Sequence, residues 1–298
     1  MCPSPAANDT PASATYQYLK GVPETPPTVL ILTALAVEYA AVRAHVTDRS
    51  ELVHEDGTVV ERGRLDGTPW TVALAELGEG ATRAAALTTR LVSWLRPQAV
   101  LFVGVAGSLK DDIGIGDVVV GTKVYGIHGG KQTPEGFLVR PEAWPASHAL
   151  DQAARSAVRD MDGVRAHFKP IATGDVVLAD ARSEIARHLR AHYNDAAAIE
   201  MEGSGAAQAA HLNGQVGALV IRGISDLADS AKRDADASGS QRRAAEQAAT
   251  VAMGVLRKHR PRGTSDSAAQ VPAGGDNLDF RGGTFYGTVI GKQVNGGR

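Results

Sequence analysis

The sequence predicts an α/β protein with a largely central sheet. Strand-like and helix-like segments alternate along most of the chain. Two continuous apolar runs, "TVLILTAL" and "AVLFVGVAG", have the β-rich composition of strands that are buried on both faces. Several strand ends then carry polar or glycine-rich sequence, and the ligands of open α/β sheets gather at such carboxyl ends. The same observations therefore predict the fold class and the edge of the sheet where a site would lie.

The first half of the alternation contains one hairpin between its strands and helices. The segment "TVVERGRLDGTPWTVALAEL" holds two strand-like runs, and Asp66-Gly67 between them is a turn pair. The predicted elements are, in order, a strand at 28–35, a helix at 37–46, this hairpin, a helix at 81–95 and a strand at 99–107 that ends in glycines.

The second half continues the alternation without a detectable repeat period. Its predicted elements are a strand at 116–126, helices near 149–160 and 180–192, a strand at 196–200 that leads into a helix at 203–212, a strand at 217–223 and a closing helix at 241–259.

Composition excludes several classes of function. The 298 residues suffice for one large domain or two smaller ones, and 43% of them are hydrophobic, which allows a sizeable core. A net charge of −2 gives no general attraction to nucleic acid or to anionic membranes. The single cysteine, Cys2, excludes a disulfide framework or a cysteine-based metal site within one chain. No metal and no cofactor is expected.

Four zones are predicted along the chain. Residues 1–26 form a Pro- and Ser-rich disordered leader without the features of a secretory signal. Residues 27–258 form the globular domain, 259–276 a flexible linker, and 277–298 a short tail. No apolar run approaches the roughly 20 residues that span a bilayer, so we expect a cytoplasmic protein.

Four strand ends carry the candidate site residues, in "TALAVE", "GVAGSL", "IEMEGSG" and "RGISDLAD". Asp226 follows an apolar strand, and either it performs chemistry or it caps the next helix together with Ser225. Glu38 has an equally ordinary interpretation as an acid in the first turn of a helix. Spacing alone leaves these alternatives open.

Glu200 and Glu202 pose the same choice, because carboxylates in a first helical turn favour the helix dipole. Residues two apart do not share a helix face. We therefore expect at most one of these two side chains to point into a given pocket.

Other chemical motifs are absent or incomplete. "GEGATRA" lacks the third glycine of a dinucleotide fingerprint, since Arg83 stands in its place. There is no P-loop and no GxSxG nucleophile motif. His188 and His192 lie four apart in "HLRAH", but no Glu follows the first His, so a solvated helix face is preferred to a zinc site.

Taken together, the blocks "ILTALAVE", "LGEGATRAA", "FVGVAGSLKDDIGIGDVVVG", "ATGDVVL", "AIEMEG" and "VIRGISDLAD" occur in a distinctive order. From about Thr28 to Lys258 the chain resembles the purine nucleoside phosphorylase/uridine phosphorylase family, and within it the methylthioadenosine/S-adenosylhomocysteine nucleosidases. The resemblance implies a single three-layer α/β/α domain with a central mixed, partly barrel-like sheet. It also implies cleavage of the N-glycosidic bond between ribose and a purine, and assembly as a dimer or hexamer.

The resemblance assigns a role to each strand end. Cleavage passes through an oxocarbenium-like transition state, so the base must be protonated and the ribose held. Asp226, supported by Ser225, would protonate purine N7, Glu202 would bind the ribose hydroxyls, and Glu38 would orient the attacking water. The resemblance implies that further residues bind the substrate: Met201 on the sugar, Val177 and Leu178 on the base, and Ala106, Gly107, Glu200 and Arg222 around them.

Two departures from the family pattern concern the nucleophile and the base. Val105 stands where a Ser or Thr hydroxyl often contacts phosphate or water, and the first-strand loop lacks the glycine that phosphorylases use to wrap phosphate. Both favour water as the nucleophile. Val177 replaces a frequent aromatic residue, which predicts weaker stacking on the base. Four basic residues would either face a phosphorylated substrate or be solvated: Lys131, Arg140, Lys232 and Arg233.

The tail "FRGGTFYGTVIGKQVNGG" has high β-propensity and no proline, as segments that stack in cross-β assemblies do. It resembles the amyloid signalling motifs at the ends of actinobacterial immune effectors, which a regulatory protein with a matching motif templates. The resemblance implies an effector that depletes adenine nucleosides or nucleotides, ATP among them. A disordered tail is the alternative.

Three hypotheses follow from these observations. The chain is a purine N-ribosyl hydrolase that acts as an immune effector, a housekeeping nucleosidase or phosphorylase with an irrelevant tail, or an assembly adaptor without catalytic activity. Activity towards nucleosides, dependence on phosphate and the effect of deleting the tail discriminate among them.

Overall fold

The structure is a computed structural model that describes residues 26–262, except 135, 215 and 230–238. The predicted leader up to residue 25, the predicted linker from residue 263 and the whole predicted tail lie outside the described residues. Lys232 and Arg233 lie outside them as well.

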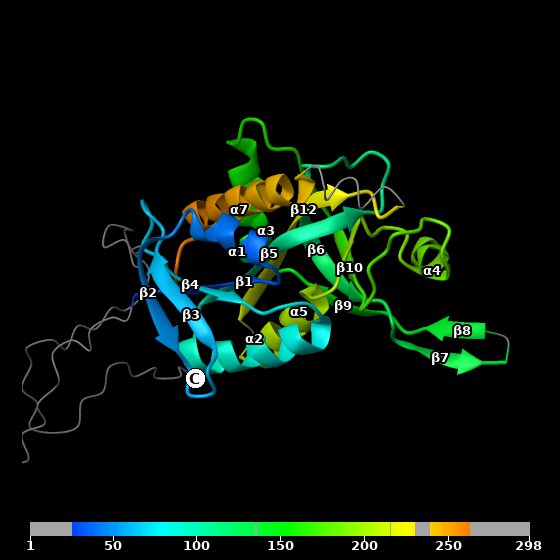
Figure 1. Cartoon of the computed structure of the whole chain (residues 1–298), viewed down its shortest axis with the longest axis horizontal. Coiled ribbons are helices and arrows are strands. Elements are labelled where there is room, and N and C mark those ends of the chain that lie inside the picture. Colours follow the sequence, from blue (N-terminus) through cyan, green and yellow to red (C-terminus); the bar gives the residue numbers. More distant parts are fainter. Residues whose placement is uncertain (1–25, 135, 215, 230–238, 263–298) are drawn as a thin grey trace, which may run out of the picture. The chain divides into compact units, whose positions relative to one another are not determined.

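Five strands close into a small barrel (Figure 1). They are β5 (Ala99–Ser108), β6 (Val118–Gly126), β10 (Ala166–Thr173), β11 (Ala198–Glu200) and β12 (Gly217–Asp226). β5 and β12 run parallel, as do β6, β10 and β11. The two groups meet antiparallel, where β12 pairs with β6 and β11 pairs with β5. This second pairing closes the ring.

Four more strands extend the sheet beyond β5. β1 (Thr28–Thr33) lies parallel to β5 and to β4 (Thr71–Glu76), and the antiparallel strands β3 (Val59–Arg64) and β2 (Thr47–Val53) complete this edge. β3 and β4 form the hairpin that the Asp66-Gly67 pair predicts.

Three short strands belong to the other side of the barrel. β9 (Glu142–Pro145) pairs with β6. β7 (Gly130–Thr133) and β8 (Gly136–Val139) form a separate hairpin that projects from the barrel (Figure 1).

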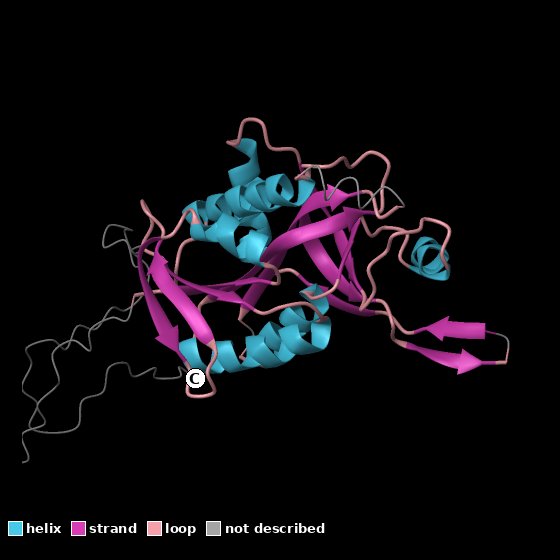
Figure 2. Ribbon diagram, viewed as in Figure 1, coloured by secondary structure: helices cyan, strands magenta, loops and turns pink. Residues whose placement is uncertain are grey.

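Helices cover both faces of the sheet (Figure 2). α1 (Ala36–Arg43), α3 (His148–Arg159) and α7 (Ser240–Lys258) pack together on one face. α2 (Ala81–Leu95) and α5 (Gly203–Leu212) pack against each other on the opposite face. The three-layer α/β/α arrangement with a mixed, partly barrel-like sheet is therefore confirmed.

The sixth described helix, α4 (Glu184–His192), lies apart from both helical layers, beyond the edge of the barrel (Figure 1). Leu189 of α4 belongs to a third apolar cluster, together with Ile127, Leu178 and Ile199. α4 and the segment before it are therefore anchored next to the barrel end where β10 and β11 finish.

The sheet is buried on both faces, as its apolar runs predict. Along β1, Val29 and Ile31 face the core beneath α7, whereas Leu30 and Leu32 face the core on the side of α2 and α5. All four side chains are fully buried. A strand between two helical layers needs apolar residues at every position, which explains the continuous run instead of an alternating one.

The predicted element boundaries agree with the structure to within a few residues, but five strands were not predicted: β2, β7, β8, β9 and β10. Most of β2 is exposed, so it has no apolar pattern to detect. β10 contains Pro170, and its pairing with β6 shifts register at that residue. Proline interrupts a strand pattern in the sequence, and the bulge accommodates it in the sheet.

Among the helices that the structure describes, none combines the length and the apolar composition needed to cross a membrane.

Candidate active site

The polar strand ends meet around a cavity of about 140 Å³. It lies at the carboxyl ends of β1, β5 and β12, beside the pairing of β11 with β5. The predicted site residues that line it are Glu38, Ala106, Gly107, Val177, Leu178, Glu200, Met201, Glu202, Ser225 and Asp226. Arg222, the remaining predicted residue, is fully buried and contacts three of these carboxylates from the interior.

Glu38 is held by backbone N–H groups from two strand ends. Its Oε2 accepts hydrogen bonds from the N–H of Ala34 (2.7 Å) and of Leu35 (3.0 Å), and its Oε1 accepts one from Val105 (2.8 Å). Glu38 is thus a first-turn acid of α1 and also lines the cavity, so the two interpretations of this residue are compatible. Burial raises the pKa of the Glu38 carboxyl, although the guanidinium of Arg222 and these N–H groups oppose the shift.

Glu200, at the end of β11, is the most extensively hydrogen-bonded of the carboxylates. Its carboxylate accepts hydrogen bonds from the hydroxyl of Thr173 and from the guanidinium of Arg222. It also accepts hydrogen bonds from the backbone N–H groups of Glu202 (3.1 Å) and Gly203 (2.8 Å). These contacts satisfy the N–H groups at the start of α5, as a capping carboxylate does. The capping interpretation therefore describes Glu200 well.

Glu202 is the N-cap residue of α5 but makes no capping hydrogen bond with its side chain. Its Oε1 instead accepts a hydrogen bond from the backbone N–H of Gly80, the N-cap residue of α2 (3.0 Å), and its Oε2 lies 3.5 Å from Nη2 of Arg222. Burial raises the pKa of the Glu202 carboxyl to about 7, Arg222 opposes the shift and Glu200 adds to it. This carboxylate is held in place while it still lines the cavity.

The expectation that only one of Glu200 and Glu202 points into a pocket is wrong. Both residues line the same cavity, and the side chains of both contact Nη2 of Arg222. The helix-face rule does not apply here, because Glu200 ends a strand and Glu202 precedes the first residue of α5. Residues two apart on an extended or turning segment project to the same side.

Three carboxylates share one buried cation. Nη1 of Arg222 lies 3.8 Å from Glu38, and its Nη2 contacts Glu200 and Glu202. With all four groups ionised, this cluster would carry two excess negative charges in a site from which water is largely excluded. Such a site favours a proton or a positive charge in the cavity. An oxocarbenium-like sugar supplies that charge in the transition state.

Asp226 lines the same cavity from the end of β12. Ser225 Oγ donates to its Oδ2 (2.9 Å), and the backbone N–H of Ala228 donates to its Oδ1 (2.9 Å). Ser225 Oγ also lies 3.4 Å from the carbonyl oxygen of Ala106. Both residues are buried, and the hydrogen bonds orient the carboxyl group at the cavity wall. Ser225 and Asp226 are the last two residues of β12.

Gly107 gives Asp226 the space that it needs. A Cβ atom at Gly107 would lie 2.8 Å from Asp226 Oδ1 and 3.1 Å from the Cβ of Ala228. Gly107 also pairs with both neighbouring strands, opposite Ile199 of β11 and Asp226 of β12. A glycine at this barrel position therefore permits strand closure and carboxylate placement together.

The remaining predicted residues form the apolar part of the lining. Leu178 is buried, Met201 is half-buried, and Val177 is exposed to 55%. Val177 and Leu178 lie on the segment between β10 and α4. An aliphatic side chain as exposed as Val177 offers little fixed surface for stacking on a base.

Some residues around the cavity were not predicted for the site. Thr173 and Gly80 hold Glu200 and Glu202, respectively, and both stand inside sequence blocks of the family pattern. Their position inside these blocks is the only feature of the sequence that could have indicated a role in the site. Glu79 also stands inside such a block and lines the cavity from the loop between β4 and α2. Gln241 lines the cavity without any such signal, because the start of α7 brings it there.

Of the four basic residues that the sequence offers for a phosphorylated substrate, the structure describes two, and these do not lie at the cavity. Lys131 is on β7 and Arg140 follows β8, and both are exposed on the projecting hairpin side. Neither lines the cavity of the carboxylates.

Comparisons with known proteins agree with this architecture. A family model described as the phosphorylase superfamily matches residues 28–257. The chain is 32% identical to a 5'-methylthioadenosine/S-adenosylhomocysteine nucleosidase of Geobacillus thermodenitrificans, over 66% of this chain and 83% of that protein. It is 29% identical to the ATP nucleosidase Cap17 of Escherichia coli, over 70% of this chain but only 48% of that protein.

Solved structures show the same likeness. A 5'-methylthioadenosine/S-adenosylhomocysteine nucleosidase from Colwellia psychrerythraea, in complex with adenine, superposes with a TM-score of 0.69 at 25% identity. The superposition covers 79% of this chain and 96% of that one. With its closed mixed barrel, its two helical layers and its match to the family model, the chain belongs to the phosphorylase superfamily.

Proposed function

We propose that this protein is a purine N-ribosyl hydrolase that cleaves the N-glycosidic bond of adenine nucleosides or nucleotides. The observation that carries the proposal is the convergence of Glu38, Glu202 and Asp226, from distant parts of the sequence, on one cavity. Nucleosidases among the relatives of the chain support the reaction type.

Each carboxylate has a task in the proposed mechanism. Asp226, oriented by Ser225 and the Ala228 N–H, protonates N7 of the purine, so that the base leaves as a neutral molecule. Glu202 accepts hydrogen bonds from the ribose hydroxyls while Gly80 and Arg222 hold it in place. The charge cluster around Arg222 stabilises the cationic sugar.

Glu38 orients the water that attacks the anomeric carbon. Its carboxylate lines the cavity, and three backbone N–H groups fix its direction. Water is favoured over phosphate because the lining carries four carboxylates besides the proposed acid Asp226, and their negative charge repels an anionic nucleophile: Glu38, Glu79, Glu200 and Glu202. At the position where the family often has a hydroxyl, Val105 contributes its backbone N–H to Glu38.

Product analysis tests this proposal. The full-length protein is incubated with adenosine, methylthioadenosine and ATP, and free adenine and the sugar product are quantified by mass spectrometry. Adenine release from at least one of them is expected. No free base from any of the three, before or after seeding assembly with preformed aggregates of a peptide that spans residues 277–298, would contradict the proposal.

An immune-effector role is the finer proposal, and two observations favour it. The tail resembles amyloid signalling motifs, and one relative of the catalytic region is named an ATP nucleosidase. In this role the protein depletes adenine nucleotides, ATP included, after a regulatory protein with a matching motif templates the tail. Seeding should then increase ATP cleavage, and deletion of residues 276–298 should abolish the increase.

The same assay separates the other two hypotheses. A housekeeping nucleosidase or phosphorylase would show equal activity with and without the tail. An assembly adaptor would keep its cellular phenotype when Asp226→Asn and Glu202→Gln remove activity. We further propose a cytoplasmic homo-oligomer, either a dimer or a hexamer, and sedimentation of the purified chain would establish the number of subunits.

A further inference from the structure

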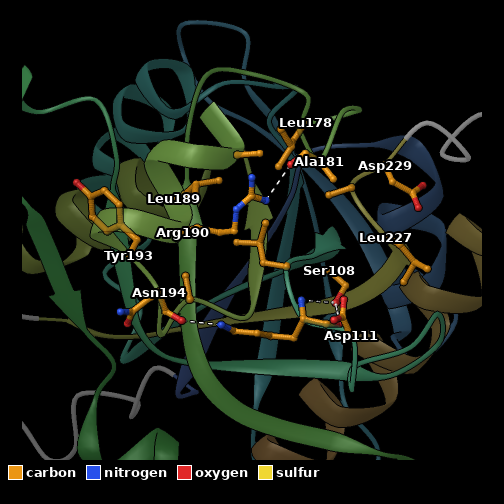
Figure 3. Close-up of a pocket in the computed structure, with 15 residues that line it drawn as sticks. Ser108, Asp111, Leu178, Ala181, Leu189, Arg190, Tyr193, Asn194, Leu227 and Asp229 are labelled. Carbon is orange, nitrogen blue, oxygen red and sulfur yellow. Dashed lines mark hydrogen bonds between the residues drawn. The ribbon is translucent and has the colours of Figure 1, made fainter. Parts of the chain in front are cut away.

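The molecule has a second and larger cavity, of about 820 Å³, which Figure 3 shows. Residues of α4, of the segment after β5 and of the segment after β12 line it. Leu178 lines both cavities. Ala228, on the wall of the larger cavity, donates its N–H to Asp226, and Ser108 follows Gly107 directly. The larger cavity therefore lies next to the part of the catalytic cavity that Asp226 and Leu178 line.

The sizes of the two cavities indicate how they divide a substrate. Small-molecule sites usually have volumes of about 300 to 1,000 Å³. The catalytic cavity, at about 140 Å³, is below that range, whereas the larger one is within it. A whole nucleoside therefore extends beyond the catalytic cavity, and the larger cavity lies on its Asp226 side.

The chemistry of a purine determines which of its atoms face the larger cavity. The exocyclic group on C6 lies on the same edge of the base as N7. A base whose N7 meets Asp226 consequently directs its C6 substituent past Asp226, towards Ala228 and Leu178. The larger cavity begins at these residues.

The lining of the larger cavity suits an uncharged group. Its apolar wall includes Leu178, Leu189 and Ala186. Two cations in the lining already donate to main-chain carbonyls, Lys110 Nζ to Asn194 (2.6 Å) and Arg190 Nη1 to Ala181 (2.8 Å), as Figure 3 shows. The carboxylates of the lining, Asp111 and Asp229, balance these two charges.

We propose that the larger cavity is an extension of the base subsite, which accepts purine nucleosides with a bulky apolar or aromatic substituent on the exocyclic amine at C6. This inference rests on the proposed function, because it uses Asp226 as the group that meets N7.

A kinetic comparison of adenosine with N6-benzyladenosine tests the inference. The full-length wild-type protein is expected to cleave the benzyl derivative with a kcat/KM within about tenfold of that for adenosine, since a well-accommodated apolar group costs little. Ala181 lines the larger cavity and is exposed, so Ala181→Trp fills the cavity without burying a new group in the core. This variant should lower the benzyl-to-adenosine ratio at least about tenfold and leave adenosine cleavage within about twofold.

A matched control lies on α4 itself. Ala191 is exposed but does not line the cavity, so Ala191→Trp should leave both substrates unchanged. Wild-type discrimination of more than about 100-fold against the benzyl derivative overturns the inference. An unchanged substrate ratio in Ala181→Trp also overturns it.

Failure of the proposed function gives a different result, in which adenosine, methylthioadenosine and ATP all release no base, and N6-benzyladenosine releases none either. Calorimetric binding of N6-benzyladenine then tests the cavity directly. Binding to wild type that Ala181→Trp weakens and Ala191→Trp retains supports an aromatic-binding cavity. Equal binding, or no binding, by wild type and Ala181→Trp rejects it.

Discussion

At the scale of single residues, Arg222 explains how three glutamates can share one buried site. A fully buried guanidinium is costly without partners, and Arg222 lies beside Glu38, Glu200 and Glu202 and over the ring of Phe102 at 4.4 Å. Even so, the carboxylates outnumber the cation. Burial raises the pKa of the Glu202 carboxyl to about 7, Arg222 opposes the shift, and the neighbouring carboxylates of Glu200 and Glu38 add to it.

Substitution of the proposed general acid should remove activity and preserve the fold. Asp226→Asn keeps the shape of the side chain but cannot deliver a proton to N7. We expect kcat to fall by about 10² to 10⁴, the usual contribution of a general acid. Rates of adenine release measure the loss, and circular dichroism shows whether the variant is folded. A folded variant with more than about a tenth of wild-type activity would exclude Asp226 as the acid.

The raised pKa of Glu202 predicts a pH-dependent stability. The folded state holds this proton more tightly than the unfolded chain, whose carboxyl has a pKa near 4.5. The stabilisation is therefore complete below about pH 4.5 and is lost as the pH rises through about 7, by up to about 3 kcal/mol. Glu202→Gln carries no titrating proton and lacks this loss.

Urea unfolding of wild type and Glu202→Gln between pH 5 and pH 8 measures the effect. The difference between the two proteins is the informative quantity, because other groups also titrate in this range. Burial raises the pKa of the Glu38 carboxyl, in the same direction as Glu202, and lowers the pKa values of His45 and His259, with the opposite effect on stability. A pH-independent difference would show that Glu202 does not titrate as described.

At the scale of elements, two glycines allow helices to approach their neighbours closely. A Cβ atom at Gly223 of β12 would lie 1.9 Å from the carbonyl oxygen of Ala244 in α7. A Cβ atom at Gly205 of α5 would lie 1.9 Å from the carbonyl oxygen of Ala81 at the start of α2. Each layer of helices therefore depends on a position where only glycine fits without a backbone shift.

The Gly223 contact gives a direct prediction about stability. Gly223→Ala must push α7 away from β12, and overpacking of this kind typically costs about 1 to 3 kcal/mol. Gly114 provides the matched control, since its φ is not positive and a Cβ atom there would meet nothing within 4 Å. Thermal unfolding should therefore show a lowered midpoint for Gly223→Ala only. Equal midpoints for the two variants would mean that α7 does not pack as closely as described.

The sequence predicts strands best where burial dictates their composition. β1 and β5 lie between two helical layers, and their continuous apolar runs make them recognisable. β2 lies at the exposed edge of the sheet, and Pro170 interrupts the pattern of β10, so neither segment has a local signal. β2 and β10 form strands because they pair with neighbouring strands. Such pairing cannot be predicted from the sequence of one segment alone.

At the scale of the whole molecule, barrel closure assembles the site. The antiparallel pairing of β11 with β5 places Ile199 opposite Gly107, and Gly107 also pairs with Asp226. Glu200 at the end of β11 and Glu202 just after it therefore line one cavity with Asp226 at the end of β12. The sequence blocks predict most of the residues that line this cavity, because each block places its site residues at positions that match the family pattern.

What the blocks do not predict is how the members contact one another. The helix-face argument separated Glu200 from Glu202, but the turn into α5 brings both to Arg222. Likewise, Glu79 reaches the cavity on a loop between Gly78 and Gly80, both of which have positive φ values. Such contacts depend on loop conformation and on barrel closure. Neither can be predicted from the spacing of residues within one block of the sequence.

The central claim is that these carboxylates catalyse hydrolysis and not phosphorolysis. The most direct test measures adenine release from adenosine in phosphate-free buffer and in phosphate buffer, and identifies the sugar product by mass spectrometry. We predict equal rates in the two buffers, with free ribose as the product. A rate that requires phosphate, with ribose 1-phosphate as the product, would contradict the account.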